Sequence, residues 1–109
     1  MKTTYESGAT RSSDTLGCRL DLIPFEGLLA CGEAMHEGAV NHGDHNWKKG
    51  LPYGVMINHA LQHISKYMCA DDSEDHIGHA IANLMMLKYF QSHRKDLDDR
   101  CFPEKKVSD

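Results

Sequence analysis

Residues 75–87 read DHIGHAIANLMML, and this stretch decides the fold because its side chains divide between two faces of one helix. The apolar face carries Ile77, Ala80, Ile81, Leu84, Met85 and, at its edge, Lys88. His76, His79 and Asn83 recur at spacings of three and four, so at about 100° per residue they share one narrow sector beside it. The stretch therefore predicts a helix, reaching about residue 93, with one packing face and one polar face.

Two segments upstream carry the same helical spacing. The first is predicted to run from Phe25 to Asn41 and to stop at Gly43, because glycine tolerates the left-handed conformation beyond a helix end. The second is predicted to begin at Pro52, which suits a first helical turn, and to reach Cys69. Their apolar positions are Leu28, Leu29, Cys31, Met35 and Ala39 in the first segment and Met56, Ala60, Ile64 and Tyr67 in the second.

The chain of 109 residues has the length of one domain. We expect a polar arm over residues 1–18, a helical domain over 19–93 and a charged, fraying tail over 94–109. Asp72 or Ser73 is the expected cap of the third helix, and no strand alternation is visible. The predicted fold is an all-α, three-helix amphipathic bundle. Because three such helices make a thin core, we expect oligomerisation to complete it.

Net charge and hydropathy exclude several classes of partner. The formal charge of −4 argues against nucleic acid, because affinity for a duplex comes mostly from neutralising phosphates. No apolar run approaches the roughly 18 residues of a membrane span, and no signal region opens the chain. None of the four cysteines forms a CxxC pair, so reduced structural thiols are expected. These features predict a cytoplasmic protein without a membrane partner.

Eight histidines are the compositional oddity of the chain. His59 and His63 are four residues apart on the second predicted helix, and His76 and His79 share a face of the third, so antiparallel packing would bring the pairs together. One interpretation is a metal site formed by His76, His79 and Asp75, and imidazole ligands suit Zn²⁺, Fe or Ni. Protonated histidines that donate to phosphate are another, and polar boundary residues are a third.

The loop GDHNWKKG, residues 43–50, carries the single tryptophan. An aromatic ring such as Trp47 beside Asn46 and Lys48 can stack on a base while lysine meets phosphate. The alternative is a loop anchor packed on the bundle. Asn83 has two interpretations as well, a hydrogen bond to a base edge or a buried amide between helices.

Five features occur in a fixed order: SGATR (7–11), RLDLIP (19–24), GDHNWKKG (43–50), the histidine-rich second helix and HIGHAIAN (76–83). In this order they resemble the phage-encoded dATP/dGTP diphosphohydrolase family, N-terminal domain, which is related to the MazG-like all-α pyrophosphohydrolases. The resemblance covers about residues 7–90. It implies a bundle shared by two or more chains that hydrolyses nucleoside triphosphates to monophosphate and pyrophosphate with Mg²⁺ or Mn²⁺, here in the host cytoplasm.

The resemblance also implies roles for single residues. MazG-like enzymes hold Mg²⁺ with ExxE and ExxD motifs, and the carboxylate pair available here is Glu33 and Glu37, which we predict to be catalytic. Histidines 76 and 79 take the place of ExxD, which favours a transition metal over magnesium. Arg11 and Arg19 match arginines of the family, and their guanidinium forks suit phosphate.

Two functions therefore stay open at the level of sequence. The first is a nucleotide diphosphohydrolase. The second is a non-catalytic nucleotide sponge, which would keep the pocket, lack the chemistry and sequester a host immune signal of the cyclic-nucleotide or ADP-ribose type.

Overall fold

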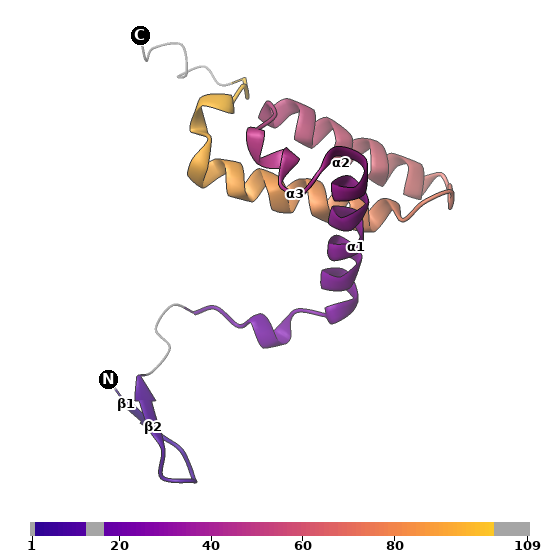
Figure 1. The fold of residues 1–109 in the computed structure, drawn as a ribbon. Helices are drawn as coiled ribbons and strands as arrows, with labels where there is room; N and C mark the ends of the chain where they lie inside the picture. Colours follow the sequence, from indigo (N-terminus) through magenta and orange to yellow (C-terminus); the bar gives the residue numbers. More distant parts are fainter. Residues whose placement is uncertain (1, 13–16, 102–109) are drawn as a thin grey trace.

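The structure, a computed structural model, describes residues 2–12 and 17–101. Its body consists of α1 (Phe25–His42), α2 (Tyr53–Met68) and α3 (His76–His93). α2 and α3 form a helical hairpin, and α1 crosses it and packs against α3 (Figure 1). Three short 3-10 helices flank these elements: η1 (Leu20–Leu22), η2 (Asn46–Lys49) and η3 (Lys95–Leu97). The predicted all-α, three-helix fold is confirmed.

The helix ends follow local sequence signals. α1 ends where Gly43 takes a φ of 96°, a conformation that L side chains rarely adopt. The start of α3 is capped by Asp75, whose carboxylate accepts the N–H of Gly78 at 3.0 Å. The prediction of Asp72 or Ser73 as this cap is wrong, because the helix begins only at His76 and the Ser73 hydroxyl donates to Asp71 in the preceding turn.

The hydrophobic core lies where α2 begins and α3 ends. Tyr53, Met56 and Phe90 are buried there, and around them pack the partly buried Trp47, Met86, Leu87, Tyr89 and Leu97. The Tyr53 hydroxyl lies 3.0 Å from the carbonyl of Phe90 and 3.2 Å from that of Arg94, close enough to donate to either. This core therefore joins the start of one helix to the end of the other.

The segment after α3 is held against this core. Arg94 donates from Nη1 to the carbonyl of Lys49 at 2.7 Å, and the Gly54 N–H donates to the Asp99 carboxylate at 2.8 Å. These two hydrogen bonds tie Arg94 and Asp99 to the segment at the start of α2. Residues 102–109 of the predicted tail lie outside the described part of the chain.

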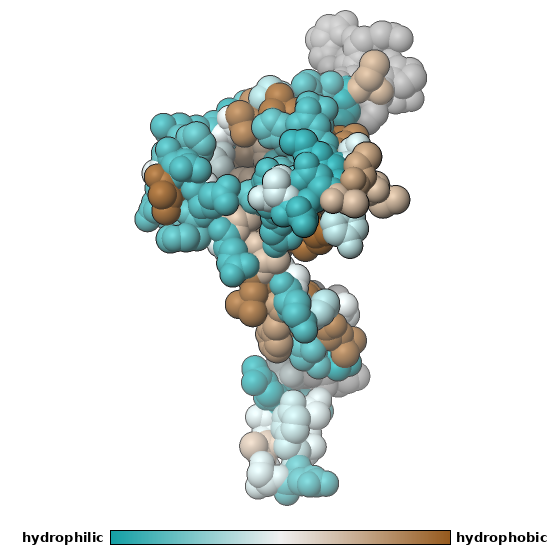
Figure 2. Space-filling view, turned by 90° about the vertical axis from the view of Figure 1, so that its right-hand side faces the viewer, coloured by the Kyte–Doolittle hydropathy of each residue, from teal (hydrophilic) through white to brown (hydrophobic). Residues whose placement is uncertain are grey.

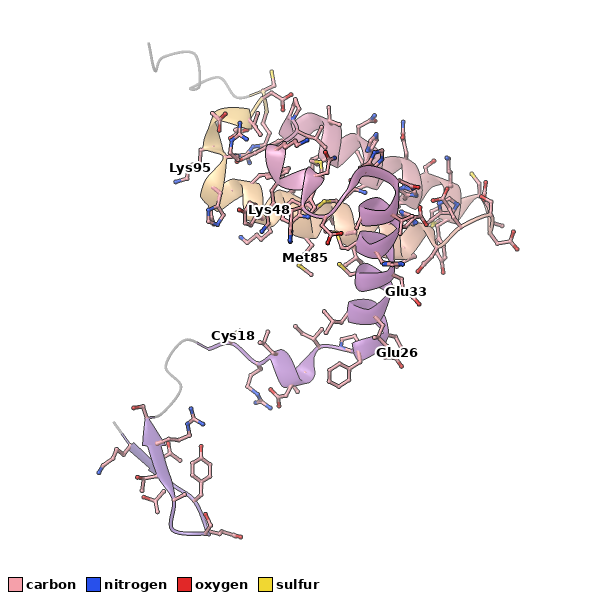
Figure 3. All side chains as sticks on the ribbon, in the orientation of Figure 1. Cys18, Glu26, Glu33, Lys48, Met85 and Lys95 are labelled. Atoms are coloured by element: carbon pink, nitrogen blue, oxygen red, sulfur yellow. The ribbon has the colours of Figure 1, made fainter. Side chains whose placement is uncertain are left out.

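The packing face of α3 differs from the one predicted, of which Ala80 is buried and Ile81 is partly buried. Ile77 and Leu84 are 40% and 47% exposed, and Met85 projects from the body (Figure 3). The buried positions are His76, Gly78, Ala80, Ala82, Asn83 and Phe90. Small residues let α1 and α2 approach the α3 backbone closely, so the polar face turns inward, while Ile77, Leu84 and Met85 are left exposed. The assignment of Ile77 and Leu84 to the packing face, and of His76 to a boundary, was wrong.

The N-terminal arm contains a short hairpin that the sequence analysis did not predict. β1 (Lys2–Thr4) pairs antiparallel with β2 (Thr10–Ser12), and Thr3 lies opposite Arg11. Gly8, at a φ of 90°, closes the turn. Figure 1 shows this hairpin well away from the helical body.

Two further observations bear on the expected setting of the chain. The four cysteines are free thiols, and burial raises the pKa of Cys31. No helix within residues 2–12 and 17–101 combines the length and the apolar character that crossing a membrane requires.

Candidate functional site

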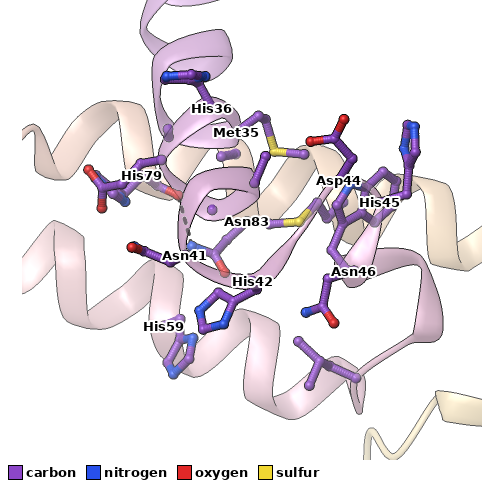
Figure 4. Close-up of a pocket in the computed structure, with 18 of the residues that line it drawn as sticks. Met35, His36, Asn41, His42, Asp44, His45, Asn46, His59, His79 and Asn83 are labelled. Atoms are coloured by element: carbon purple, nitrogen blue, oxygen red, sulfur yellow. Dashed lines mark hydrogen bonds and ion pairs between the residues drawn. The ribbon is translucent and has the colours of Figure 1, made fainter.

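A cavity of about 720 Å³ lies between α1, the loop after it, α2 and α3. Six histidines line it: His36, His42, His45, His59, His63 and His79. Its other polar side chains are Glu37, Asn41, Asp44, Asn46 and Asn83, and several of these converge in Figure 4. The size falls within the range of small-molecule sites. The arrangement suits a polar ligand that accepts many hydrogen bonds.

The loop from α1 to α2 forms one wall of this cavity. His45 takes a left-handed φ of 63° and turns the chain into η2. Trp47 then packs edge-on against Tyr89, with ring centroids 4.9 Å apart, and lies 6.0 Å from Phe90. The Nζ of Lys48 is 5.8 Å from the centroids of the Trp47 and Tyr89 rings. The tryptophan is therefore an anchor of the loop and a lining residue of the cavity.

A histidine cluster lies where α2 ends and α3 begins. The Nδ1 atoms of His63 and His76 are 3.0 Å apart, and Nε2 of His76 is 3.2 Å from the Asp71 carboxylate. His76 is only 2% exposed. The ring of His63 stacks on that of His79 with centroids 4.9 Å apart. The structure thus brings together histidines from the two helices, as antiparallel packing predicted.

The surroundings of this cluster lower the pKa of His63 and of Asp71, which leaves the first neutral and the second charged. Burial, and then the neighbouring His79, lower the pKa of His63. Hydrogen bonds from Ser73, and then from His76, hold the pKa of Asp71 well below its usual range. At neutral pH the cluster therefore contains a neutral His63 imidazole and an ionised Asp71 carboxylate.

Carboxylates surround His79 at the edge of the cluster. Nε2 of His79 is 3.5 Å from Glu74 and 3.8 Å from Glu37. A smaller hollow of about 280 Å³ adjoins it and is lined by Glu33, Glu37, Glu74 and Asp75. The two carboxylates predicted to be catalytic therefore lie beside the histidine cluster.

One group of side chains is spaced to hold a metal ion. His63, Glu74 and His76 each offer a ligand atom within 4.8 Å of the other two. This group shares only His76 with the predicted set, which also contained His79 and Asp75. The Asp75 carboxylate instead caps α3. Sequence spacing marked His63 as a candidate, but no local signal selected Glu74.

The fold places only some of the residues predicted to contact phosphate or base at the cavity. Asn46, Trp47 and Asn83 line the cavity, and Asn83 also donates to the carbonyl of His79 at 2.8 Å. Arg19 forms a two-bond pair with Asp21 at 2.7 and 2.8 Å, and Arg11 lies in β2. Neither arginine lines the cavity. Sequence reasoning missed His36, His42 and His45, whose spacing is not that of a recognisable motif.

The fold and the cavity define a small, mostly helical protein with a polar, histidine-rich cavity. A family model described as dATP/dGTP diphosphohydrolase, N-terminal, matches residues 7–100, and the chain belongs to this family. Comparison with curated proteins and with solved structures gave no match.

Proposed function

We propose that the protein binds a nucleotide in the cavity between the three helices and hydrolyses a deoxynucleoside triphosphate to monophosphate and pyrophosphate. The observation that carries the proposal is a cavity of about 720 Å³, lined by six histidines and flanked by carboxylates, in a chain of this family. Imidazolium and amide N–H groups suit phosphate oxygens, and the amides also suit base edges.

The proposed roles follow the positions of the side chains. Asn46, Asn83 and the edge of Trp47 hold the base, since all three line the cavity. Lys48 does not line the cavity but lies beside the Trp47 ring, and it would meet phosphate at the rim. Glu33 and Glu37 position water at the adjoining hollow. A bound divalent ion would supply neutralisation of phosphate charge and activation of water.

We also propose that the chain self-associates. η1 and the start of α1 expose an apolar segment, formed by Leu20, Leu22, Ile23, Phe25, Leu28 and Leu29, and Figure 2 shows hydrophobic surface on the narrow part that leads to the arm. The radius of gyration is 18.7 Å, against about 13 Å for a compact domain of this length. A second copy is the proposed partner because its η1 and α1 expose the same apolar segment, and the two segments can cover each other.

Self-association also bears on the arginines. Within one chain Arg11 and Arg19 lie away from the cavity, so contact with phosphate requires the arm of a second subunit. Light scattering at micromolar concentration tests this proposal. A stable monomer would contradict it, and Leu29→Glu should shift a real oligomer towards monomer.

The function is tested by incubating the untagged protein with dATP, dGTP and other nucleotides in the presence of Mg²⁺, Mn²⁺ or Zn²⁺. Chromatography should detect monophosphate and pyrophosphate, while quenching or enhancement of the fluorescence of Trp47, the single tryptophan, reports binding. Glu37→Gln should bind but turn over poorly. Glu26→Gln, at the far end of α1 (Figure 3), is the matched control and should behave as wild type.

The alternative is a non-catalytic sponge for a cyclic-nucleotide or ADP-ribose-type immune signal. It is favoured by the excess of imidazoles over carboxylates in the main cavity, where only Glu37 and Asp44 are acidic. Tight binding of such a ligand, with intact ligand recovered after long incubation, would select this function over hydrolysis.

A further inference from the structure

We propose that His63, His76 and Glu74 form a binding site for a zinc-class transition-metal ion, with Asp71 orienting His76 as a ligand. The use of this ion in nucleotide chemistry rests on the proposed function, but its binding rests only on the geometry of the cluster. In this site His63 and Glu74 take the places of His79 and Asp75, which the sequence had predicted as ligands beside His76.

The ligand atoms come from three separate segments and already converge. His63 belongs to α2, His76 opens α3, and Glu74 lies in the turn between them. The two Nδ1 atoms are 3.0 Å apart. Two nitrogens bound to one tetrahedral ion at about 2.0–2.1 Å each lie about 3.3 Å apart, so the imidazoles need to separate slightly and turn their Nδ1 atoms towards the ion. The Glu74 side chain is 41% exposed and lies 3.5 Å from Nε2 of His79, a contact that it would exchange for the ion.

Asp71 fixes the tautomer of the buried imidazole. Nε2–H of His76 donates to the Asp71 carboxylate at 3.2 Å, which leaves its Nδ1 without a proton. Asp71 is held in turn by the N–H and hydroxyl of Ser73 at 2.9 and 2.6 Å. A carboxylate behind a ligating histidine is the usual outer support of protein metal sites. Because His76 is almost fully buried, water does not compete with Asp71 for the hydrogen bond of its Nε2–H.

His63 would take one neutral tautomer without an ion and the other neutral tautomer with an ion bound. Without an ion, its Nδ1–H donates to Nδ1 of His76, which satisfies both rings. With an ion, His63 takes the other neutral tautomer and both Nδ1 lone pairs point at the metal. The change moves a proton between the nitrogens of one ring and requires no net proton release.

The donor set selects the class of metal. Two imidazoles and one carboxylate suit Zn²⁺, Co²⁺ or Fe²⁺, whereas Mg²⁺ prefers oxygen ligands in octahedral geometry. Three protein ligands also leave a coordination position open, as in catalytic zinc sites. His63 lines the main cavity, so the site adjoins the space proposed for nucleotide.

The test is titration of the untagged, chelator-treated full-length chain with Co²⁺, followed by visible absorption, and with Zn²⁺, followed by calorimetry. We expect one ion per chain, a visible band typical of four or five ligands, and no displacement by millimolar Mg²⁺. No nucleotide is present, so failure here leaves the nucleotide assay unaffected.

Four variants sharpen the test. His63→Ala and Glu74→Gln should each lower affinity at least tenfold, and both positions are exposed enough for the fold to persist, as circular dichroism would verify. Asp71→Asn should weaken binding about 10–100-fold, the scale of lost outer support. His93→Ala, which removes a histidine stacked on Tyr89, is the matched control and should bind as wild type. Absence of the band, or equal affinity in folded His63→Ala and His93→Ala, would overturn the site.

Discussion

The two ends of the α2–α3 hairpin are built from opposite chemistry. Where α2 begins and α3 ends, Tyr53, Met56 and Phe90 form a buried cluster closed by aromatic rings. Where α2 ends and α3 begins, the buried His76 pairs with the partly buried His63 and has an aspartate behind it. The same two helices therefore carry an apolar end and a polar end.

The difference teaches how stability and chemistry are divided. Burying a large apolar side chain stabilises a fold by about 1.5–3 kcal/mol. A buried imidazole stabilises it only to the extent that its hydrogen bonds replace those with water. The apolar end thus holds the hairpin together, and the polar end retains groups that gain more from a bound ligand. Four predictions test this division.

The largest effect is expected at the apolar end. Phe90→Ala should lower the free energy of unfolding by about 3–5 kcal/mol, because it empties the centre of the core. Urea unfolding followed by circular dichroism measures the loss. Met68→Ala, at the exposed last residue of α2, is the control and should change stability by less than about 1 kcal/mol. Similar losses in both variants would contradict the assignment of the core.

At the polar end, His76→Ala should lower stability by about 1–3 kcal/mol, because it removes the hydrogen-bond partner of His63 Nδ1 and leaves Asp71 with Ser73 alone. The effect on ligand binding should be larger than the effect on folding. Calorimetry with metal and with nucleotide, beside urea unfolding, compares the two. A variant that binds normally yet unfolds as easily as Phe90→Ala would make this end structural.

His79→Ala separates binding from folding more cleanly, because His79 is partly exposed and its Nε2 faces Glu74 and Glu37. Nucleotide affinity should fall by at least about 1 kcal/mol, the scale of one lost polar contact. Stability should change little. Unchanged affinity in a well-folded variant would return this histidine to the role of a boundary residue.

The smallest expected effect is a dependence of stability on pH. His63 has a lowered pKa in the folded chain, so below about pH 6.5 the unfolded state binds the extra proton first. The stabilisation is therefore complete above pH 6.5 and declines as the pH falls from there towards the folded-state pKa. The charged or titratable groups acting on His63 are His79, Glu74, His76 and Lys66.

Urea midpoints at pH 7.5 and 5.5 measure this dependence. The wild type should lose more stability across the interval than His63→Gln, which keeps a polar side chain but cannot titrate. An identical loss in the two proteins would show that other groups control the acid response.

The sequence alone determined the parts of this protein that depend on neighbours along the chain. The spacing of apolar residues, with Pro52 and Gly43, predicted both ends of α1 and α2 to within a residue, whereas α3 begins at His76, later than a cap at Asp72 or Ser73 implies. Motif order predicted the family that the chain belongs to. Helix-face spacing also indicated that histidines of α2 and α3 would meet.

Only the tertiary structure decided which face of α3 is buried, which carboxylates join the histidines, and where the arginines lie. Gly78 shows why, because a Cβ added there would lie 3.1 Å from Ala30 in α1. Small residues occupy the buried positions because they let the helix backbones come close together. The number of apolar side chains on a face does not measure this closeness. Glu74, Asp71 and the Arg19–Asp21 pair likewise depend on the path of turns. Spacing along the chain fixes local geometry, whereas distances between elements arise only when the helices pack.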